Sequence, residues 1–194
     1  MVKDEGKFQL KGKDVIGKRV LILGEIGSGK TALLARLLKE LMALLNHEEI
    51  TVIDMAPQRL GEIGGKISDY LGSIDKIRYL SPKKVYTPRL TGTSCEQVLK
   101  YTELNRKLID PLLNCFVQRI TKVLVLNDVT LYLHAGKLEK ILNCMKLAET
   151  FLVTGYCGSR LDEDLGAGIS VREKELIEKL ATYMDQVIKM NKVL

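Results

Sequence analysis

The sequence predicts an α/β fold in which a parallel sheet is covered by helices on both faces, giving three layers. Two observations lead to this prediction. Short, nearly continuous apolar segments alternate along the chain with longer segments whose apolar residues recur at helical spacing. Strands that are apolar on both faces are typical of parallel sheets buried between helices. The 194 residues are enough for one full-sized core, so we expect a single domain over 1–194.

The elements expected within this domain follow from apolar runs and from helix start signals. The strands are expected at 19–23, 50–54, 76–80, 122–126, 150–154 and 186–190. The helices are expected at 32–45, 67–71 and 137–146. Ser94 with Gln97, and Ser170 with Glu173, have capping-box spacing and should each open a further helix. Pro111 is expected to kink or interrupt the first of these two.

Two segments depart from this regular alternation. Residues 1–18 are expected to form an N-terminal hairpin or extension. Residues 55–94 are expected to be a loop-rich insertion, because they carry several glycines and prolines. Lys83, Lys84 and Arg89 make this insertion basic, and they belong either to a lid or anion-binding loop or to ordinary surface charge.

Composition and charge exclude several classes of protein. The longest apolar stretches are interrupted by charges, so we expect no membrane insertion, and the acidic N-terminus does not resemble a signal peptide. A cytoplasmic location is therefore expected. The four cysteines form no C-x-x-C pair, and the two histidines, at 47 and 134, are interpreted as loop or helix-end residues. The net charge of +6 permits an anionic partner such as DNA, whereas the absence of Trp argues against an aromatic platform for single strands.

The most informative feature is a phosphate-loop motif, Gly-x4-Gly-Lys-Ser/Thr, between the first strand and the first helix. Glycines let the backbone curl so that its N–H groups surround a polyphosphate at the positive end of the helix. Lys30 can reach the β- and γ-phosphates, and the Thr31 hydroxyl can ligate Mg²⁺. The alternative is a glycine turn that only joins a strand to a helix. The expected nucleotide-binding residues are Gly24, Glu25, Ile26, Gly27, Ser28, Gly29, Lys30, Thr31 and Ala32.

A second half of the site is expected at the end of the strand 123–128. Asp128 lies where an apolar strand delivers an acid to the carboxyl edge of the sheet, which is where ligands bind in open α/β sheets. There it would complete a Mg²⁺ site with Thr31. Its alternative role is to cap the following turn.

These two motifs resemble those of the P-loop NTPases, and the resemblance covers most of the chain. The strand between the motifs and the closing strand are similar to the division that includes RecA-like and AAA-like ATPases. The resemblance implies a P-loop NTPase fold of RecA-like type, with a further strand between the two motif strands in the sheet, and the use of ATP and Mg²⁺. It also implies that Thr154 is a polar sensor and that Arg160 reaches the γ-phosphate in cis or as an arginine finger. The alternatives are a plain strand-end residue and a surface arginine.

The chain departs from this family where two consecutive acids are common, because it has Asn127-Asp128-Val129. If Asn127 takes the metal position, Asp128 is free to act as the base. If Asp128 takes the metal position, which is our preference, Val129 stands where the base belongs. In either alignment hydrolysis is expected to be slow or to need another acid. Glu25 and Asp54 are the candidates for that acid.

Three functional classes follow. The first is an ATPase (NTP hydrolase) that couples nucleotide binding or hydrolysis to assembly or nucleic-acid work, with DNA and a homo-oligomer as candidate partners. The second is a small-molecule kinase or nucleotide-dependent transferase similar to the corrinoid adenosyltransferases, which predicts a closed pocket lined from 55–94. The third is a nucleotide-binding regulatory subunit with little turnover. ATP is the expected nucleotide because the Asn-Lys-x-Asp guanine signature is absent.

Overall fold

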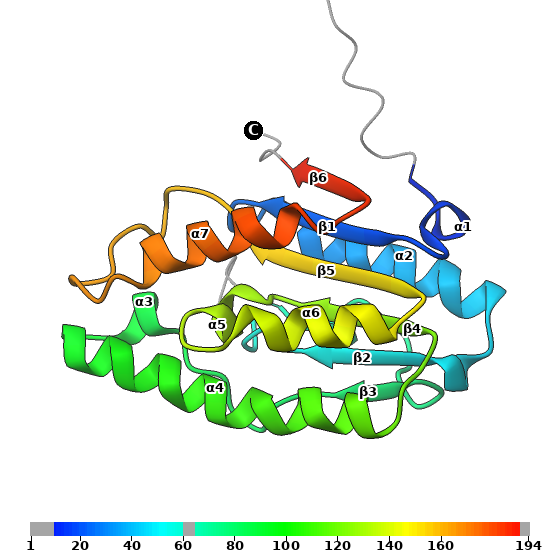
Figure 1. Ribbon diagram of the computed structural model, residues 1–194, viewed down its shortest axis with the longest axis horizontal. Coiled ribbons are helices and arrows are strands. Elements are labelled where there is room, and N and C mark those ends of the chain that lie inside the picture. Colours follow the sequence, from blue (N-terminus) through cyan, green and yellow to red (C-terminus); the bar gives the residue numbers. More distant parts are fainter. Residues whose placement is uncertain (1–9, 60–64, 191–194) are drawn as a thin grey trace, which may run out of the picture.

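A six-stranded, all-parallel sheet forms the centre of the protein in the computed structural model, which describes residues 10–59 and 65–190. The strand order is β3-β2-β4-β5-β1-β6, and Figure 1 shows the strands in this sequence from one edge to the other. Every neighbouring pair is parallel. The strands are β1 (Arg19–Gly24), β2 (Ile50–Asp54), β3 (Arg78–Leu80), β4 (Val123–Asn127), β5 (Thr150–Tyr156) and β6 (Gln186–Met190).

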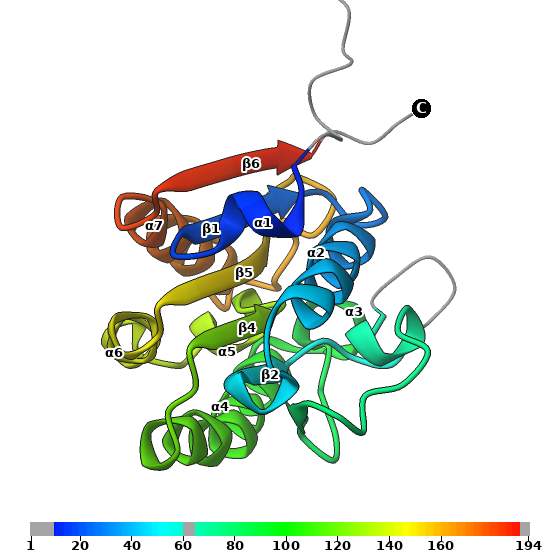
Figure 2. The ribbon, with the colours of Figure 1, turned by 90° about the vertical axis from the view of Figure 1, so that its right-hand side faces the viewer.

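Helices cover both faces of this sheet (Figure 2), which confirms the predicted fold class. One face packs against α1 (Gly12–Val15), α2 (Lys30–Leu44) and a short 3-10 turn, η2 (Ile67–Asp69). The other packs against α4 (Cys95–Gln118), α5 (Thr130–Leu133), α6 (Leu138–Leu147) and α7 (Ile169–Ala181). The four central strands are buried almost throughout because each lies between these two layers.

The order of the strands places the two sequence motifs in the same part of the sheet. β5 lies between β1, which leads into the phosphate loop, and β4, which ends at Asn127. This is the additional-strand arrangement implied by the resemblance. Since all strands are parallel, their carboxyl ends share one edge, and α3 (Pro88–Thr91) and the loop before α7 lie at the same end of the molecule (Figure 1).

Some local expectations were wrong. The described part of the N-terminal segment forms the helical turn α1 instead of a hairpin strand, while residues 1–9 lie outside the described residues. Helix α4 runs through Pro111 without interruption. Pro111 is exposed, so water can reach the carbonyl that its missing N–H leaves without a helical partner.

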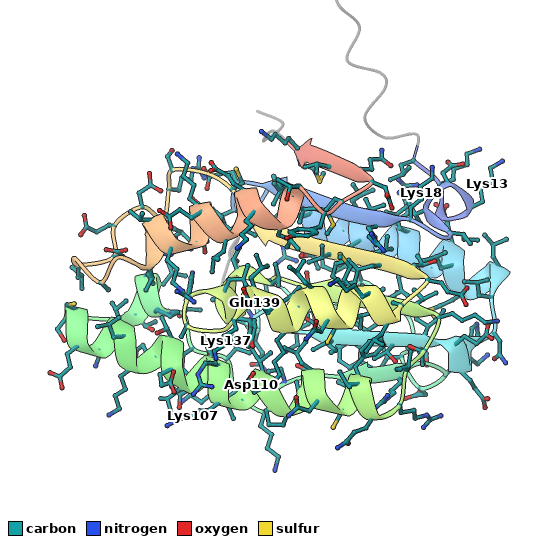
Figure 3. The ribbon with its side chains drawn as sticks, viewed as in Figure 1. Lys13, Lys18, Lys107, Asp110, Lys137 and Glu139 are labelled. Atoms are coloured by element: carbon teal, nitrogen blue, oxygen red, sulfur yellow. The ribbon has the colours of Figure 1, made fainter. Side chains whose placement is uncertain are left out.

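A charged side chain away from the carboxyl edge, Asp110, has a structural role. Asp110 on α4 accepts hydrogen bonds from Lys140 Nζ at 2.8 Å and from the Tyr132 hydroxyl at 3.0 Å, which ties α4 to α6 and α5. Figure 3 shows Asp110 beside these elements, and shows Lys13 and Lys18 at the opposite end of the sheet from α3. Within the described residues, no helix is long and apolar enough to cross a membrane.

Candidate functional site

The phosphate loop forms a tight turn between β1 and α2, as its glycines allow. Gly27 and Gly29 have φ values of 72° and 84°, which residues with a Cβ atom rarely adopt. Gly24 is needed for a different reason, because a Cβ atom there would lie 2.5 Å from the Met190 carbonyl oxygen of β6. The loop therefore presents the amino end of a fifteen-residue helix to the carboxyl edge of the sheet.

Lys30 lies inside this turn. Its Nζ donates hydrogen bonds to the carbonyl oxygens of Gly24 at 2.8 Å and Glu25 at 2.7 Å. Burial lowers the pKa of Lys30, and the neighbouring Asp128 carboxylate opposes this shift. The Ser28 hydroxyl is buried in the same loop without a hydrogen-bond partner within the described residues. A movable ammonium group and an unsatisfied hydroxyl fit a site for phosphate oxygens.

The second motif meets the first through Thr31 and Asn127. The Thr31 hydroxyl donates to Asn127 Oδ1 at 3.4 Å. Thr154 Oγ1 also donates to Asn127 Oδ1, at 2.9 Å. The oxygen side of the Asn127 amide thus faces the phosphate loop, and together with Thr31 it offers two neutral oxygen donors of the kind Mg²⁺ accepts.

Asp128 follows the end of β4 in a left-handed conformation, with φ of 58°. Its N–H donates to Thr154 Oγ1 at 2.8 Å, and one of its carboxylate oxygens accepts from the Thr130 hydroxyl at 2.6 Å. Desolvation raises the pKa of Asp128, while the Thr130 hydrogen bond and the charge of Lys30 lower it by less. A carboxylate with a raised pKa beside the phosphate loop is suited to accepting a proton.

The remaining expected residues take different positions. Thr154 is buried and orients the second motif through both of its bonds, to Asn127 and to Asp128. Glu25 accepts a hydrogen bond from the Ser159 N–H at 3.0 Å. Although desolvation opposes the change, hydrogen bonds from Tyr156 and the Ser159 backbone lower the pKa of Glu25. Asp54 is fully buried and hydrogen-bonded through both oxygens.

A cavity of about 340 Å³ opens beside the loop. Residues 26–31 line it. Residues 55–94 contribute Ala56, Pro57, Arg59, Gly65, Tyr70, Thr87, Pro88, Arg89 and Leu90. Asn127, Asp128 and Thr154 also line it, whereas Arg160 is exposed and is not among the described lining residues.

Sequence reasoning missed a buried charged cluster in the wall of this cavity. Arg89 forms a two-bond ion pair with Glu173, at 2.8 and 3.1 Å, and each side chain is only 5% exposed. His134 Nε2 lies 2.6 Å from the same Glu173 carboxylate. The capping box expected at Ser170 and Glu173 is therefore wrong, because Gly168 is the N-cap of α7, Ser170 lies inside the helix, and Glu173 binds Arg89. His134 is the C-cap residue of α5, which is the helix-end position that the sequence allows, and it is a buried member of this cluster.

Breaking the Arg89–Glu173 pair should destabilise the protein strongly. Glu173→Gln leaves the Arg89 guanidinium buried without a countercharge, which typically costs about 3–5 kcal/mol of unfolding free energy. Urea denaturation measures this loss. Glu103→Gln is the matched control, because its ion pair with Arg106 is on the surface and should change stability little. An equally small effect at Glu173 would mean that the pair does not close the cavity wall.

The comparisons with known proteins bear on the fold alone. No protein-family model matches the chain, and no match was found among curated proteins. Among solved structures, the chain is similar to the Pif1 helicase of Candida albicans, with 16% identity, a TM-score of 0.45, and coverage of 100% of this chain and 41% of that one. It is also similar to the Hef helicase domain of Pyrococcus furiosus, with 15% identity, a TM-score of 0.46, and coverage of 100% and 40%. The chain spans about two fifths of the length of these structures.

Proposed function

We propose that this protein binds Mg–ATP in the loop 24–31 and hydrolyses it. The observation that carries the proposal is the contact between the two motifs, in which the Thr31 hydroxyl meets the Asn127 amide oxygen at 3.4 Å. This contact supports one shared binding site, because a loop that only joined β1 to α2 would not need a hydrogen bond to the end of β4. Thr31 and Asn127 would hold Mg²⁺ at this site, and the ion would offset the charge that develops on the phosphate oxygens.

The same contact supports one of the two alignments of the second motif. Asn127 is the residue whose side chain accepts from the Thr31 hydroxyl, so we propose Thr31 and Asn127 as the metal-side pair. This replaces the magnesium role that the sequence favours for Asp128. Asp128 is then available to take a proton from the attacking water, and its raised pKa supports this role. Neither Asp54 nor Glu25 is needed as a substitute base.

Lys30, Thr154 and the Arg89–Glu173 pair would each have a different role in the reaction. Lys30 would exchange its two backbone carbonyl partners for the β- and γ-phosphates, which are stronger acceptors. Thr154 would hold Asp128 in place through the Asp128 N–H. The buried wall around Arg89 and Glu173 would limit access of bulk water.

ATPase work linked to assembly or to DNA remains our first candidate for the process, with a homo-oligomer as the candidate active form. Arg160 supports this reading only as an exposed residue in a loop next to the phosphate loop, from which it could reach a neighbouring subunit. The net charge of +6 is compatible with a nucleic-acid partner.

A second candidate is transfer of a group from ATP to a small acceptor. The observation that favours it is that residues from 55–94 line the cavity together with the phosphate loop. A concave pocket of this kind suits a small bound acceptor better than a polymer. Asp128 would then deprotonate the acceptor instead of water.

Steady-state phosphate release from ATP, with and without DNA, separates these candidates. An ATPase acting on DNA should release phosphate faster when DNA is present. A transferase should release little free phosphate even when its acceptor is present, because the transferred group ends on the acceptor, and DNA should have no effect. Failure to bind Mg–ATP at all would contradict both.

A further inference from the structure

The Asn127 side chain has two kinds of partner, one on each side of its amide. Its Nδ2 donates to Asp54 Oδ1 at 2.9 Å and to the Gly65 carbonyl at 3.4 Å. Its Oδ1 accepts from the hydroxyls of Thr31 and Thr154. The Asp54 carboxylate and the Gly65 carbonyl, which face Nδ2, can only accept hydrogen bonds. The two hydroxyls that face Oδ1 can donate or accept. Asp54 and the Gly65 carbonyl therefore determine which end of the amide faces the phosphate loop.

Asp54 is held so that it can impose this orientation. It lies at the end of β2, which pairs with β4 in a register that places Asp54 next to Asn127. Its other oxygen accepts from the Ile67 N–H at 2.6 Å and from the Tyr79 hydroxyl at 2.5 Å, and the Ala56 N–H approaches Oδ1 at 3.2 Å. With so many donors around a fully buried carboxylate, this acceptor cannot readily turn away.

The same contact explains why residue 127 is not an acid. An aspartate at 127 would put a second buried carboxylate about a hydrogen-bond length from Asp54, with no donor between the two. An asparagine supplies that donor and still presents an oxygen to Thr31. The end of β4 therefore carries the amide of Asn127, and the end of the neighbouring strand β2 carries the carboxylate of Asp54.

We infer that Asp54 is a positioning residue for the nucleotide site, which acts by keeping the oxygen of Asn127 turned toward Thr31 and the bound metal. The inference rests on the proposed Mg–nucleotide site. Partners that orient metal ligands typically change metal affinity by 10–100-fold when they are replaced.

The sharpest test begins with Asp54→Asn. The new amide can donate to residue 127, so Asn127 can turn over and present its NH₂ group to Thr31 and Thr154. The contact between residues 54 and 127 is kept, while the Ala56 N–H and the Gly65 carbonyl each lose a hydrogen-bond partner. The Mg²⁺ concentration needed for half-maximal binding of a fluorescent ADP analogue should rise about 10- to 100-fold. Binding in EDTA should be unchanged. Thr51→Val is the matched control, since Thr51 is buried on the same strand, bonds Thr121 at 2.8 Å, and lies at the opposite end of the sheet.

Rescue distinguishes orientation from a merely structural effect. A carboxylate at 127 accepts on both sides, so adding Asn127→Asp to Asp54→Asn should restore the wild-type Mg²⁺ requirement. The Asn127→Asp change alone should be the least stable of the set, because it opposes two buried carboxylates. The double variant should melt at a higher temperature than that single variant, although the Ala56 N–H loses an acceptor.

The Mg²⁺ requirement and the melting temperature test different parts of the inference. A Mg²⁺ requirement that does not change in Asp54→Asn, or is not restored in the double variant, would overturn the positioning role. A double variant that melts no higher than Asn127→Asp alone would overturn the pairing on which the role depends, whether or not nucleotide binds. Absence of Mg²⁺-dependent binding by the wild-type chain would instead remove the proposed function, and with it the metal part of the inference.

Discussion

Replacing Lys30 with alanine should lower the affinity for Mg–ATP by about 100-fold or more. The ammonium group is placed inside the loop, where it would bond two phosphates, and each hydrogen bond to a charged group is worth about 1.5–3 kcal/mol. Lys30 is partly buried, which strengthens these bonds relative to bulk water. Isothermal titration calorimetry with a slowly hydrolysed ATP analogue measures the change.

Lys39→Ala is the matched control for this experiment. Lys39 lies on the same helix, α2, but it is exposed and is not among the described residues that line the cavity. Its removal should leave nucleotide affinity near the wild-type value. If both variants bind like the wild type, the loop 24–31 does not hold the phosphates.

Asp128→Asn should reduce the rate of ATP turnover by about 10²- to 10⁴-fold while leaving Mg–ATP affinity nearly unchanged. An amide keeps the size of the side chain and can still accept from Thr130, but it cannot take a proton. Because the ionised form is the base and desolvation raises its pKa, the wild-type rate should also rise with pH above the ordinary aspartate range. Single-turnover kinetics measured alongside calorimetry provide both quantities.

The same variant separates the two alignments of the second motif. If Asp128 held the metal, Asp128→Asn would weaken Mg–ATP binding and turnover together. Asp162→Asn is the control, because Asp162 is an exposed acid in the loop before α7. An Asp128→Asn rate equal to that of the wild type would remove the base assignment and require another proton acceptor.

The fold could be predicted from the sequence because its signals are local. Each central strand is a short apolar run, and the phosphate loop is contiguous, with glycines whose positive φ values explain their presence. The position of β5 between β1 and β4 was reached only through the resemblance of both motifs to a known family, since no local pattern encodes the order of strands in a sheet.

The site was predicted less completely because its remaining contacts join distant parts of the chain. Glu173 has the spacing of a capping box with Ser170, and nothing nearby indicates that its partner is Arg89. Similarly, the sequence allows two alignments of the Asn127-Asp128 pair, and the Thr31 contact that supports one of them joins residues 96 positions apart. The reason for an amide at 127 is evident only from the sheet, in which the pairing of β2 with β4 places Asp54 beside it.

A crystal structure of the protein with Mg²⁺ and an ATP analogue tests the central claim most directly. It should show the β- and γ-phosphates inside the loop 24–31, with Lys30 Nζ moved from the Gly24 and Glu25 carbonyls to phosphate oxygens. The metal should lie against Thr31 and the oxygen of Asn127. A nucleotide bound elsewhere, or a Lys30 still bonded to both carbonyls with the loop empty, would contradict the account.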